Sequence, residues 1–331
     1  MASMELVTKK RFMLVSGNGN QQLAQEIADE LKVTLGDMSL STFSNGELYV
    51  RYSDSIRGAD VFIIQSHCEP INDRIMEQMI MIDAAKRASA KRITAVVPFY
   101  GYARQDRKAQ GREAITAKLI ADMLTVAGVD RVVTVDLHTG QIQGFFDCPV
   151  DHLTAVPLLA EYLGDKIEGD ITVVSPDAGG GKRARKFANI LEAMGTDTEL
   201  AFIDKRRPKG TFNESVAEEV VGEVDGRTCI LVDDMIDTAG TMCAAAELLK
   251  ARGAKDVYMA ATHGVLSGPA IERLGNASVK EVVITNTIPL PTHAQTTKIT
   301  SLSIAPIIAK ALDHVFEDAS VSEMFHGDNY Q

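Results

Sequence analysis

One stretch of the chain decides its fold: Val232-Asp233-Asp234-Met235-Ile236-Asp237-Thr238-Ala239-Gly240-Thr241. The residues that lead into it, Cys229 to Val232, are apolar and partly β-branched, so they predict a buried strand that ends at the two carboxylates. A helix is expected to begin near Met242 and to end before Gly253. A strand that turns through small residues into a helix presents backbone N–H groups at the helix N-terminus, and such groups bind a phosphate dianion.

The side chains of this stretch fit a phosphorylated sugar. Its two threonines add hydroxyl donors, and Gly240 lets the backbone approach the phosphate oxygens. Asp233 and Asp234 repel a phosphate, so we expect them to accept hydrogen bonds from sugar hydroxyls, directly or through a cation. The alternative is a plain helix cap and turn, since Asp and Thr commonly precede helices. Two acids after a buried strand, followed by a third acid and a small loop, favour a binding site.

Short β-branched runs alternate with helical patterns over most of the chain, which predicts an α/β fold with mainly parallel sheets flanked by helices. The runs are apolar at odd and even positions, as expected of strands covered on both faces. Between them, Leu23, Ile27 and Leu31 recur every four residues and predict a helix. The expected strands are 12–16, 61–65, 93–98, 132–136, 171–175, 200–203, 229–233, 257–262 and 281–285.

The two halves of the chain share a layout, which predicts two tandem domains. Residues 93–107 form an expected strand that runs into a basic segment, and so do residues 200–209. Later in each half an apolar strand ends in acid, at Asp136 in the first and at the acid pair in the second. We therefore expect an N-terminal domain at 1–154 and a C-terminal domain at 155–331. Packing of the C-terminal tail back on the first domain is an alternative to its place in the second.

Composition and charge narrow the class of protein. The chain has 331 residues, 45% of them hydrophobic, with a formal net charge of −11. That charge opposes nonspecific binding to nucleic acid or to an acidic membrane surface. The apolar run after the basic residues 9–11 is short for a signal peptide, so a cytoplasmic location is expected. The widely spaced cysteines predict buried thiols rather than disulfides or a zinc site; they are Cys68, Cys148, Cys229 and Cys243.

The phosphate loop resembles that of the type I phosphoribosyltransferase fold, most of whose members use phosphoribosyl pyrophosphate, while one family makes it. Almost the whole chain resembles that one family, the ribose-phosphate pyrophosphokinases. The motifs that carry the resemblance, besides the loop, are Phe43-Ser44-Asn45-Gly46-Glu47, Ser55-Ile56-Arg57-Gly58, Arg104-Gln105-Asp106-Arg107-Lys108, Asp136-Leu137-His138, Gln141-Ile142-Gln143-Gly144-Phe145-Phe146-Asp147, Ser175-Pro176-Asp177 and Asp204-Lys205-Arg206-Arg207-Pro208. The resemblance implies two phosphoribosyltransferase-like domains.

The resemblance also implies a reaction and a set of site residues. Mg-ATP would pass its diphosphoryl group to the anomeric hydroxyl of ribose 5-phosphate, giving phosphoribosyl pyrophosphate and AMP. The implied catalytic residues are Lys205 and Arg207. The implied ATP-binding residues are Phe43, Asn45, Gly46, Glu47, Arg104, Gln105 and Asp106. The implied ribose 5-phosphate-binding residues are Arg207, Asp233, Asp234, Asp237, Thr238, Ala239, Gly240 and Thr241. The implied contacts to Mg²⁺ or its waters are His138 and Asp177.

Assembly and regulation are further implications of the resemblance. The family places the nucleotide between neighbouring subunits of a homohexamer, so Phe43, Asn45 and Glu47 would serve an adjacent chain's active site. Phosphate and ADP would act as effectors at a regulatory site at subunit contacts. The implied regulatory residues are Ser55, Arg57, Ser320 and Ser322.

Two other functions share parts of this pattern. A nucleobase phosphoribosyltransferase would use the same phosphate loop but has no need of the motifs of the first half. A non-catalytic subunit that regulates a true synthetase would be expected to lose parts of the loop or of the basic segment 205–207, here called the lysine arm. Lys205, Arg207 and the whole loop are present here, so a catalytic synthetase is favoured.

Overall fold

The computed structural model describes residues 10–177, 179–206, 217–294 and 298–325. Within these ranges the chain divides into two compact units. The first comprises residues 10–153 and 305–325, and the second comprises residues 154–304. Among the helices that the structure describes, none has the length and apolar character that crossing a membrane requires.

The first unit is built on a five-stranded sheet in which every neighbouring pair is parallel, in the order β1-β4-β5-β6-β7. Its strands are β1 (Phe12–Ser16), β4 (Asp60–Ile64), β5 (Arg92–Val97), β6 (Arg131–Val135) and β7 (Val150–Leu153). Its α-helices are α1 (Gln21–Leu31), α2 (Ile71–Arg87), α3 (Thr116–Ala127) and α8 (Ala305–Phe316), with 3-10 turns at Gly140–Phe145 and Ser322–Phe325.

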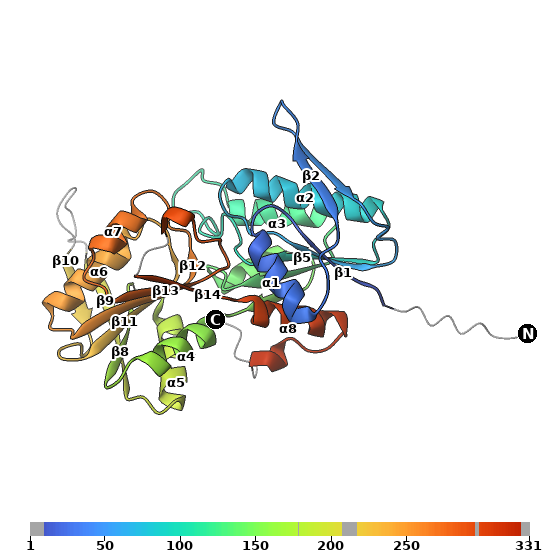
Figure 1. Ribbon diagram of the computed structural model, residues 1–331. Helices are drawn as coiled ribbons and strands as arrows, with labels where there is room; N and C mark the ends of the chain where they lie inside the picture. Colours follow the sequence, from blue (N-terminus) through green and yellow to red (C-terminus); the bar gives the residue numbers. More distant parts are fainter. Residues whose placement is uncertain (1–9, 178, 207–216, 295–297, 326–331) are drawn as a thin grey trace, which may run out of the picture. The chain divides into compact units, whose positions relative to one another are not determined.

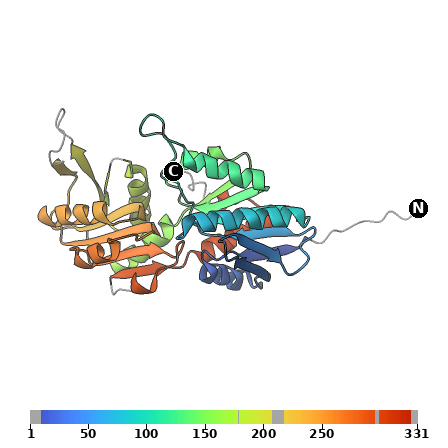
Figure 2. The ribbon, with the colours of Figure 1, turned by 90° about the horizontal axis from the view of Figure 1, so that it is seen from above.

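Helices cover both faces of this sheet (Figures 1 and 2). Alternate strand residues such as Val15 and Ile63 belong to the core that α2 and α3 close. On the opposite face Phe12 stacks on Phe62 and meets the ring of Phe316 edge to face, with centroids 4.6 and 5.2 Å apart. Helix α8 therefore returns to the first sheet from the far end of the sequence and packs against α1.

A two-stranded antiparallel hairpin projects from the first unit (Figure 1). It consists of β2 (Met38–Thr42) and β3 (Leu48–Tyr52), and its tip is residues 43–47. The hydroxyl of Tyr52 donates to the carbonyl of Met81 at 3.1 Å, which fixes the base of the hairpin to α2. The expected strands do not include this hairpin.

The second unit holds a seven-stranded sheet in the order β10-β9-β8-β11-β12-β13-β14, parallel except for the β9–β10 pair. Its strands are β8 (Ile171–Ser175), β9 (Thr198–Arg206), β10 (Ala217–Val221), β11 (Thr228–Ile236), β12 (Asp256–Gly264), β13 (Glu281–Thr285) and β14 (Ile299–Leu302). Its α-helices are α4 (Val156–Lys166), α5 (Gly181–Ala193), α6 (Gly240–Ala251) and α7 (Ala270–Asn276), with a 3-10 turn at Thr292–Ala294.

These helices also form two layers around the sheet. Helices α6 and α7 close a core that includes Leu231, Met259 and Ile284, while α4 and α5 pack together on the other face (Figure 1). The expectation of tandem α/β domains with mainly parallel sheets flanked by helices is confirmed. All four cysteines are free thiols, but only Cys68 and Cys229 are buried as predicted, whereas Cys148 and Cys243 are half-buried. Burial raises the pKa of the Cys229 thiol to about 11.

Candidate active site

Strand β11 carries the acid pair at the carboxyl edge of the second sheet, where open α/β sheets bind their ligands. It pairs with β8 only from Thr228 to Leu231, whereas its pairing with β12 continues to Ile236. Asp233 and Asp234 therefore lie inside the strand, beyond its last residue pair with β8. The prediction that the strand stops at these carboxylates is wrong, because β12 still supplies backbone partners for Met235 and Ile236.

The two carboxylates share one arginine from α5. Arg183 places its Nη1 atom 3.2 Å from Oδ1 of Asp233 and 3.4 Å from Oδ1 of Asp234. The Arg183 and Asp234 side chains are buried, and Asp233 is 25% exposed. Burial and then the neighbouring Asp234 carboxylate raise the pKa of Asp233 to about 7, and Arg183 opposes both. Near neutral pH the pair can accept hydrogen bonds from hydroxyl groups while Arg183 limits their mutual repulsion.

The phosphate loop is held by two side chains that follow β12. The Ser267 hydroxyl donates to Oδ1 of Asp237. Arg273 donates from Nη1 to the carbonyl of Thr238 at 2.9 Å. Ala239 adopts a left-handed conformation with φ of 59°, which is unfavourable for a residue with a Cβ atom. The turn is therefore a constrained backbone conformation that is supported from outside its own sequence.

Helix α6 begins at Gly240, two residues before the predicted start near Met242. Its first turn includes the N–H groups of Gly240 and Thr241, which have no intrahelical acceptors by geometry. The first helical bond in this turn runs from the N–H of Cys243 to the carbonyl of Ala239 at 2.9 Å. The side chains of both loop threonines are exposed. The loop thus offers backbone and hydroxyl donors to an anion, as the sequence predicts.

The turn after β8 lies at the same edge of the second sheet. Oδ1 of Asp177 accepts the N–H groups of Gly179 and Gly180 at 2.8 and 3.0 Å, and its backbone carbonyl accepts the Ser175 hydroxyl at 2.6 Å. These bonds fix an exposed carboxylate next to the start of α5. The described ranges contain no group of three or more metal-ligating side chains. A single fixed carboxylate such as that of Asp177 can bind an ion whose remaining ligands are phosphate oxygens and water.

The hairpin tip presents the residues expected at the adenine. Phe43 is 54% exposed, with its ring 5.8 Å from that of Tyr49. The tip is closed by bonds from the N–H of Phe43 to the carbonyl of Glu47 at 2.8 Å and from the N–H of Glu47 to Oδ1 of Asn45 at 3.2 Å. Gly46 has φ of 92°, which a side chain would disfavour. A hydrogen-bonded turn at the end of a projecting arm therefore carries these exposed side chains.

The three other residues expected at the nucleotide lie between β5 and α3; they are Arg104, Gln105 and Asp106. Gln105 accepts the hydroxyl of Thr116 at 2.6 Å, which places it at the start of α3. Asp106 accepts the hydroxyl of Thr139 at 2.8 Å, and Thr139 follows His138 directly. The first unit thus brings Asp106 beside the segment that carries the half-buried His138. His138 and Asp177 belong to different units.

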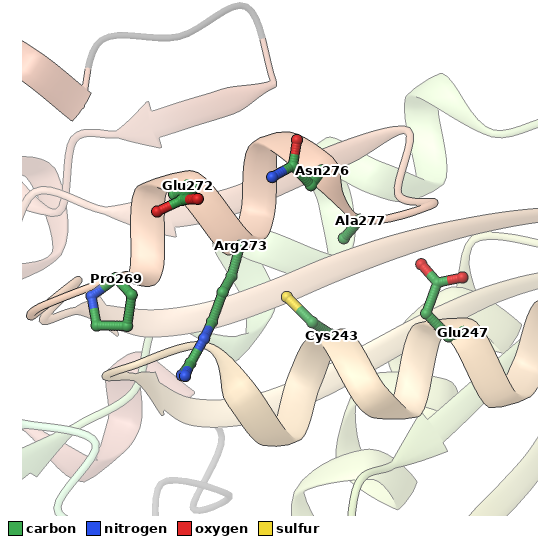
Figure 3. Close-up of a pocket in the computed structure, with 7 residues that line it drawn as sticks. All are labelled: Cys243, Glu247, Pro269, Glu272, Arg273, Asn276 and Ala277. Carbon is green, nitrogen blue, oxygen red and sulfur yellow. The ribbon is translucent and has the colours of Figure 1, made fainter.

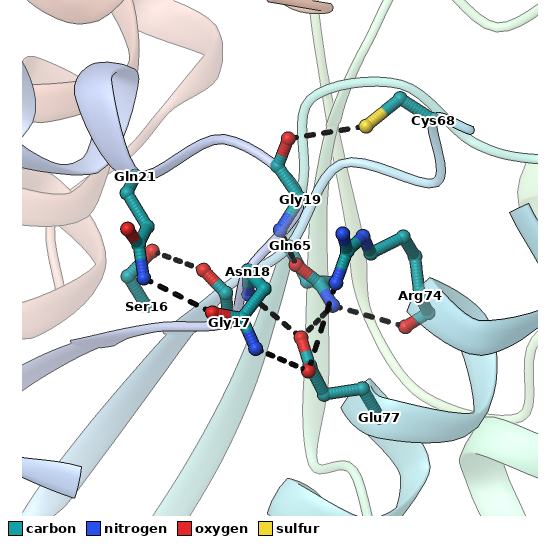
Figure 4. A network of polar contacts seen from close by, with 9 residues as sticks. All are labelled: Ser16, Gly17, Asn18, Gly19, Gln21, Gln65, Cys68, Arg74 and Glu77. Atoms are coloured by element: carbon teal, nitrogen blue, oxygen red, sulfur yellow. Dashed lines mark hydrogen bonds and ion pairs between the residues drawn. The ribbon is translucent and has the colours of Figure 1, made fainter. Parts of the chain in front are cut away.

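A second polar network fixes the loop between β1 and α1 in the first unit (Figure 4). Glu77 is buried, and its carboxylate accepts the backbone and side-chain N–H groups of Asn18 at 2.7 and 2.6 Å and the amide of Gln65 at 2.7 Å. The Gln65 oxygen in turn accepts the N–H of Gly19 at 2.8 Å. These bonds satisfy a buried charge and hold the ends of β1 and β4 together.

The remaining expected residues are placed as follows. Ser55 and Arg57 line a pocket of about 510 Å³ that also includes Arg87, in the first unit. Ser320 lies in the same unit, with its carbonyl 2.8 Å from Nδ1 of His314, and Ser322 begins a 3-10 turn. The backbone of Lys205 lies in β9 opposite Glu218 of β10. Arg207 lies outside the described residues.

Sequence reasoning missed three residues that contact the phosphate loop and the acid pair, namely Arg183, Ser267 and Arg273. For Arg183 a signal exists, because it is four residues before Phe187 and eight before Leu191, both buried on α5. A basic residue in register with a buried apolar stripe indicates a buried ion pair. Ser267 and Arg273 carry no such signal, since their partners are set by how α7 packs on α6.

Two α/β units, one with an acid pair and a phosphate loop at its sheet edge, define an enzyme with the phosphoribosyltransferase type of fold. A family model described as the N-terminal domain of ribose phosphate pyrophosphokinase matches residues 12–128, and one described as a phosphoribosyl synthetase-associated domain matches residues 196–326. The chain belongs to the ribose-phosphate pyrophosphokinase family, as its relatives also show.

Among these relatives, a ribose-phosphate pyrophosphokinase of Streptomyces avermitilis is 56% identical over 326 residues, which cover 98% of this chain and 99% of the relative. One from Caldanaerobacter subterraneus is 55% identical over 313 residues, covering 94% and 97% of the two chains. The crystal structure of phosphoribosylpyrophosphate synthetase from Mycobacterium smegmatis is 50% identical, with a TM-score of 0.88 over 94% of this chain and 100% of that one.

Proposed function

We propose that this enzyme transfers the diphosphoryl group of Mg-ATP to the anomeric hydroxyl of ribose 5-phosphate, giving phosphoribosyl pyrophosphate and AMP for nucleotide biosynthesis. The observation that carries the proposal is the pairing of Asp233 and Asp234 with a phosphate loop at one sheet edge, in a chain that also keeps the family's nucleotide motifs. The names of the close relatives support the same reaction.

The acceptor sugar is bound by the second unit. The loop from Asp237 to Thr241 binds the 5-phosphate through N–H and hydroxyl donors. Asp233 and Asp234 accept hydrogen bonds from the ribose hydroxyls, while Arg183 orients both carboxylates and opposes the rise in the pKa of Asp233 that burial causes. Fixing the sugar in this way aligns its anomeric hydroxyl for in-line attack on the β-phosphorus.

The nucleotide is bound by the first-unit motifs. Phe43 packs against the adenine, Asn45 and Glu47 contact its polar edge, and the segment 104–106 contacts the rest of the nucleotide. Because Phe43 is exposed at the tip of a projecting hairpin, we propose that it serves the active site of a neighbouring subunit in a homohexamer. Aromatic side chains such as Phe are enriched in interfaces between proteins, which supports this proposal.

Charge neutralisation drives the transfer step. Lys205 and Arg207 stabilise the negative charge on the transferred diphosphate, as phosphoryl-group transfer requires. Magnesium, when bound, neutralises further charge on the phosphate oxygens. We propose that His138 and Asp177 contact the ion or its waters, and the exposed Asp177 carboxylate, which backbone hydrogen bonds hold in place, supports this proposal.

Phosphate and ADP are proposed as effectors, acting through Ser55, Arg57, Ser320 and Ser322. The pocket that Ser55 and Arg57 line also includes Arg51, Arg87 and the acidic Asp54, and Arg87 pairs with Asp83 at 2.7 Å. Arg51 and Arg57 are the arginines that we propose for a phosphate group there. We place the enzyme in the cytoplasm, where its substrates for nucleotide biosynthesis are found.

Phosphorus NMR tests the reaction. The full-length protein is incubated with Mg-ATP and ribose 5-phosphate, without any nucleobase and with or without inorganic phosphate. AMP and phosphoribosyl pyrophosphate should appear together, faster when phosphate is present. Product formation only after a nucleobase and phosphoribosyl pyrophosphate are supplied would indicate a nucleobase phosphoribosyltransferase, and an inert pure protein would indicate a regulatory subunit. Equal rates with and without phosphate would refute activation by phosphate alone.

A further inference from the structure

Arg273 reaches the phosphate loop from a helix that the nucleotide and sugar motifs do not include. It lies on α7 and lines a pocket of about 440 Å³ together with Cys243 and Glu247 of α6. Figure 3 shows its side chain extending from α7 across this pocket toward the start of α6. There its Nη1 atom donates to the carbonyl of Thr238 at 2.9 Å, and a Cβ atom at Gly240 would lie 3.2 Å from the same nitrogen.

The Thr238 carbonyl controls the direction of the next backbone donor. In a trans peptide unit the C=O and N–H groups share one plane and point in opposite directions. A carbonyl held toward α7 therefore turns the N–H of Ala239 away from α7. Rotation of this peptide unit would relieve the left-handed conformation of Ala239, whose φ is 59°. The bond from Arg273 opposes that rotation.

The helix that carries Arg273 is itself fixed. Glu247 of α6 accepts the N–H of Ser278 at 2.8 Å and its hydroxyl at 3.1 Å, directly after α7. Lys298 donates to the carbonyls of Gly275 and Ala277 at 2.8 and 3.0 Å, at the end of α7. The arginine is therefore supported by a helix tied to both α6 and the segment before β14, and it acts on the loop from a rigid base.

We infer that Arg273 is a positioning residue for ribose 5-phosphate: by holding the Thr238 carbonyl it aims the Ala239 N–H at the 5-phosphate. The inference rests on the proposed binding of ribose 5-phosphate at this loop. Arg273 does not touch the substrate; it acts through the peptide unit between residues 238 and 239. Loss of the Arg273 side chain should therefore weaken the binding of ribose 5-phosphate and leave the binding of ATP unaffected.

Steady-state kinetics and calorimetry with full-length protein test this role. R273A, R273Q and R273K are compared with the matched control N276A, which changes another residue that lines the same pocket on the same helix. R273A should raise both KM and Kd for ribose 5-phosphate about fivefold, the loss of one charge-assisted bond at a partly solvated site. The KM for ATP should stay within about twofold, and R273K should recover part of the effect.

The outcomes separate three cases. An unchanged KM for ribose 5-phosphate in R273A, with normal binding by the wild type, overturns the inference. Equal rises in both KM values together with a lowered melting temperature also overturn it, since they indicate general destabilisation. A wild-type protein that neither binds ribose 5-phosphate nor forms AMP refutes the proposed function instead. If R273A fails to fold, R273Q takes its place, and the test is again whether the KM for ribose 5-phosphate rises more than the KM for ATP.

Discussion

Arg183 places one guanidinium nitrogen between two carboxylates, 3.2 Å from Asp233 and 3.4 Å from Asp234. The strand that carries these acids continues past them, so both carboxylates lie within β11 rather than after its last residue. Two adjacent carboxylates in a buried setting repel one another and favour protonation. Arg183 is the residue that allows both to remain available to a sugar.

Replacing Arg183 with methionine should weaken ribose 5-phosphate binding. Without the cation the pKa of Asp233 rises further, so the carboxylate is protonated at neutral pH and accepts fewer hydrogen bonds. We expect the KM for ribose 5-phosphate to rise at least about tenfold at pH 7 and to fall toward the wild-type value as the pH is raised. R185M, which changes an exposed arginine of the same helix, is the control. A pH-independent defect would contradict this account.

Protein stability should depend on the ionisation of Asp233. Its pKa is raised to about 7 in the folded state, mainly by burial, from an unfolded value near 4. A raised pKa means that the folded state binds the proton more tightly, so this contribution to stability is present below about pH 4 and is lost as the pH rises through about 7. As the pH is raised from 4 to 8, the melting temperature of D233N should fall less than that of the wild type. D165N, at an exposed position on α4, should follow the wild type.

Lys205 should act in the transfer step rather than in binding. K205A is expected to lower kcat by at least about a hundredfold, as for loss of one transition-state donor. Quenched-flow or steady-state measurement of AMP formation gives kcat and both KM values. A near-normal kcat with only a raised KM would remove Lys205 from the chemistry.

The exposed hairpin tip predicts active sites shared between subunits. A double variant F43A/E47A and the variant K205A should each be nearly inactive alone. In a mixed oligomer, a working site forms where the intact hairpin of a K205A chain meets the intact Lys205 of an F43A/E47A chain. If each site forms between two chains, random mixing makes about a quarter of the sites complete, so co-expression should restore about a quarter of the wild-type rate. Separately purified variants mixed without subunit exchange provide the control. Absence of recovery in verified mixed oligomers would place the hairpin in its own chain's site.

The fold was largely predictable because its central strands are covered on both faces. Runs such as Ile171–Ser175 and Glu281–Thr285 are buried throughout, and three of the five residues in each are the β-branched apolar residues Val or Ile. The missed strands β7, β10 and β14 lie at sheet edges, and β2 and β3 form a half-exposed hairpin. In β7 the polar His152 is buried because its Nε2 atom accepts the N–H of Leu137 at 2.8 Å, a partner that no local pattern reveals.

The site was predictable only where it is local in sequence. The loop from Asp237 to Thr241 is one continuous segment, and its chemistry follows from its own residues. Its supports come from elsewhere: Arg183 is 50 residues from Asp233, and Arg273 is 35 residues from Thr238. Single-sequence patterns do not encode which helices meet at a sheet edge. The same limit explains why the sequence predicts that the strand stops at the acid pair: the spacing on α5 indicates that Arg183 is buried, but it does not reveal that Asp233 and Asp234 are its partners.

The central claim is transfer of an intact diphosphoryl group, and isotope tracing tests it most directly. Mg-ATP carrying radioactive phosphorus at the γ position, or in a parallel reaction at the α position, is incubated with ribose 5-phosphate and the purified enzyme. The account predicts that γ label appears in phosphoribosyl pyrophosphate and α label in AMP, in equal molar amounts. Appearance of ADP with label in a ribose bisphosphate, or no transfer to the sugar at all, would contradict it.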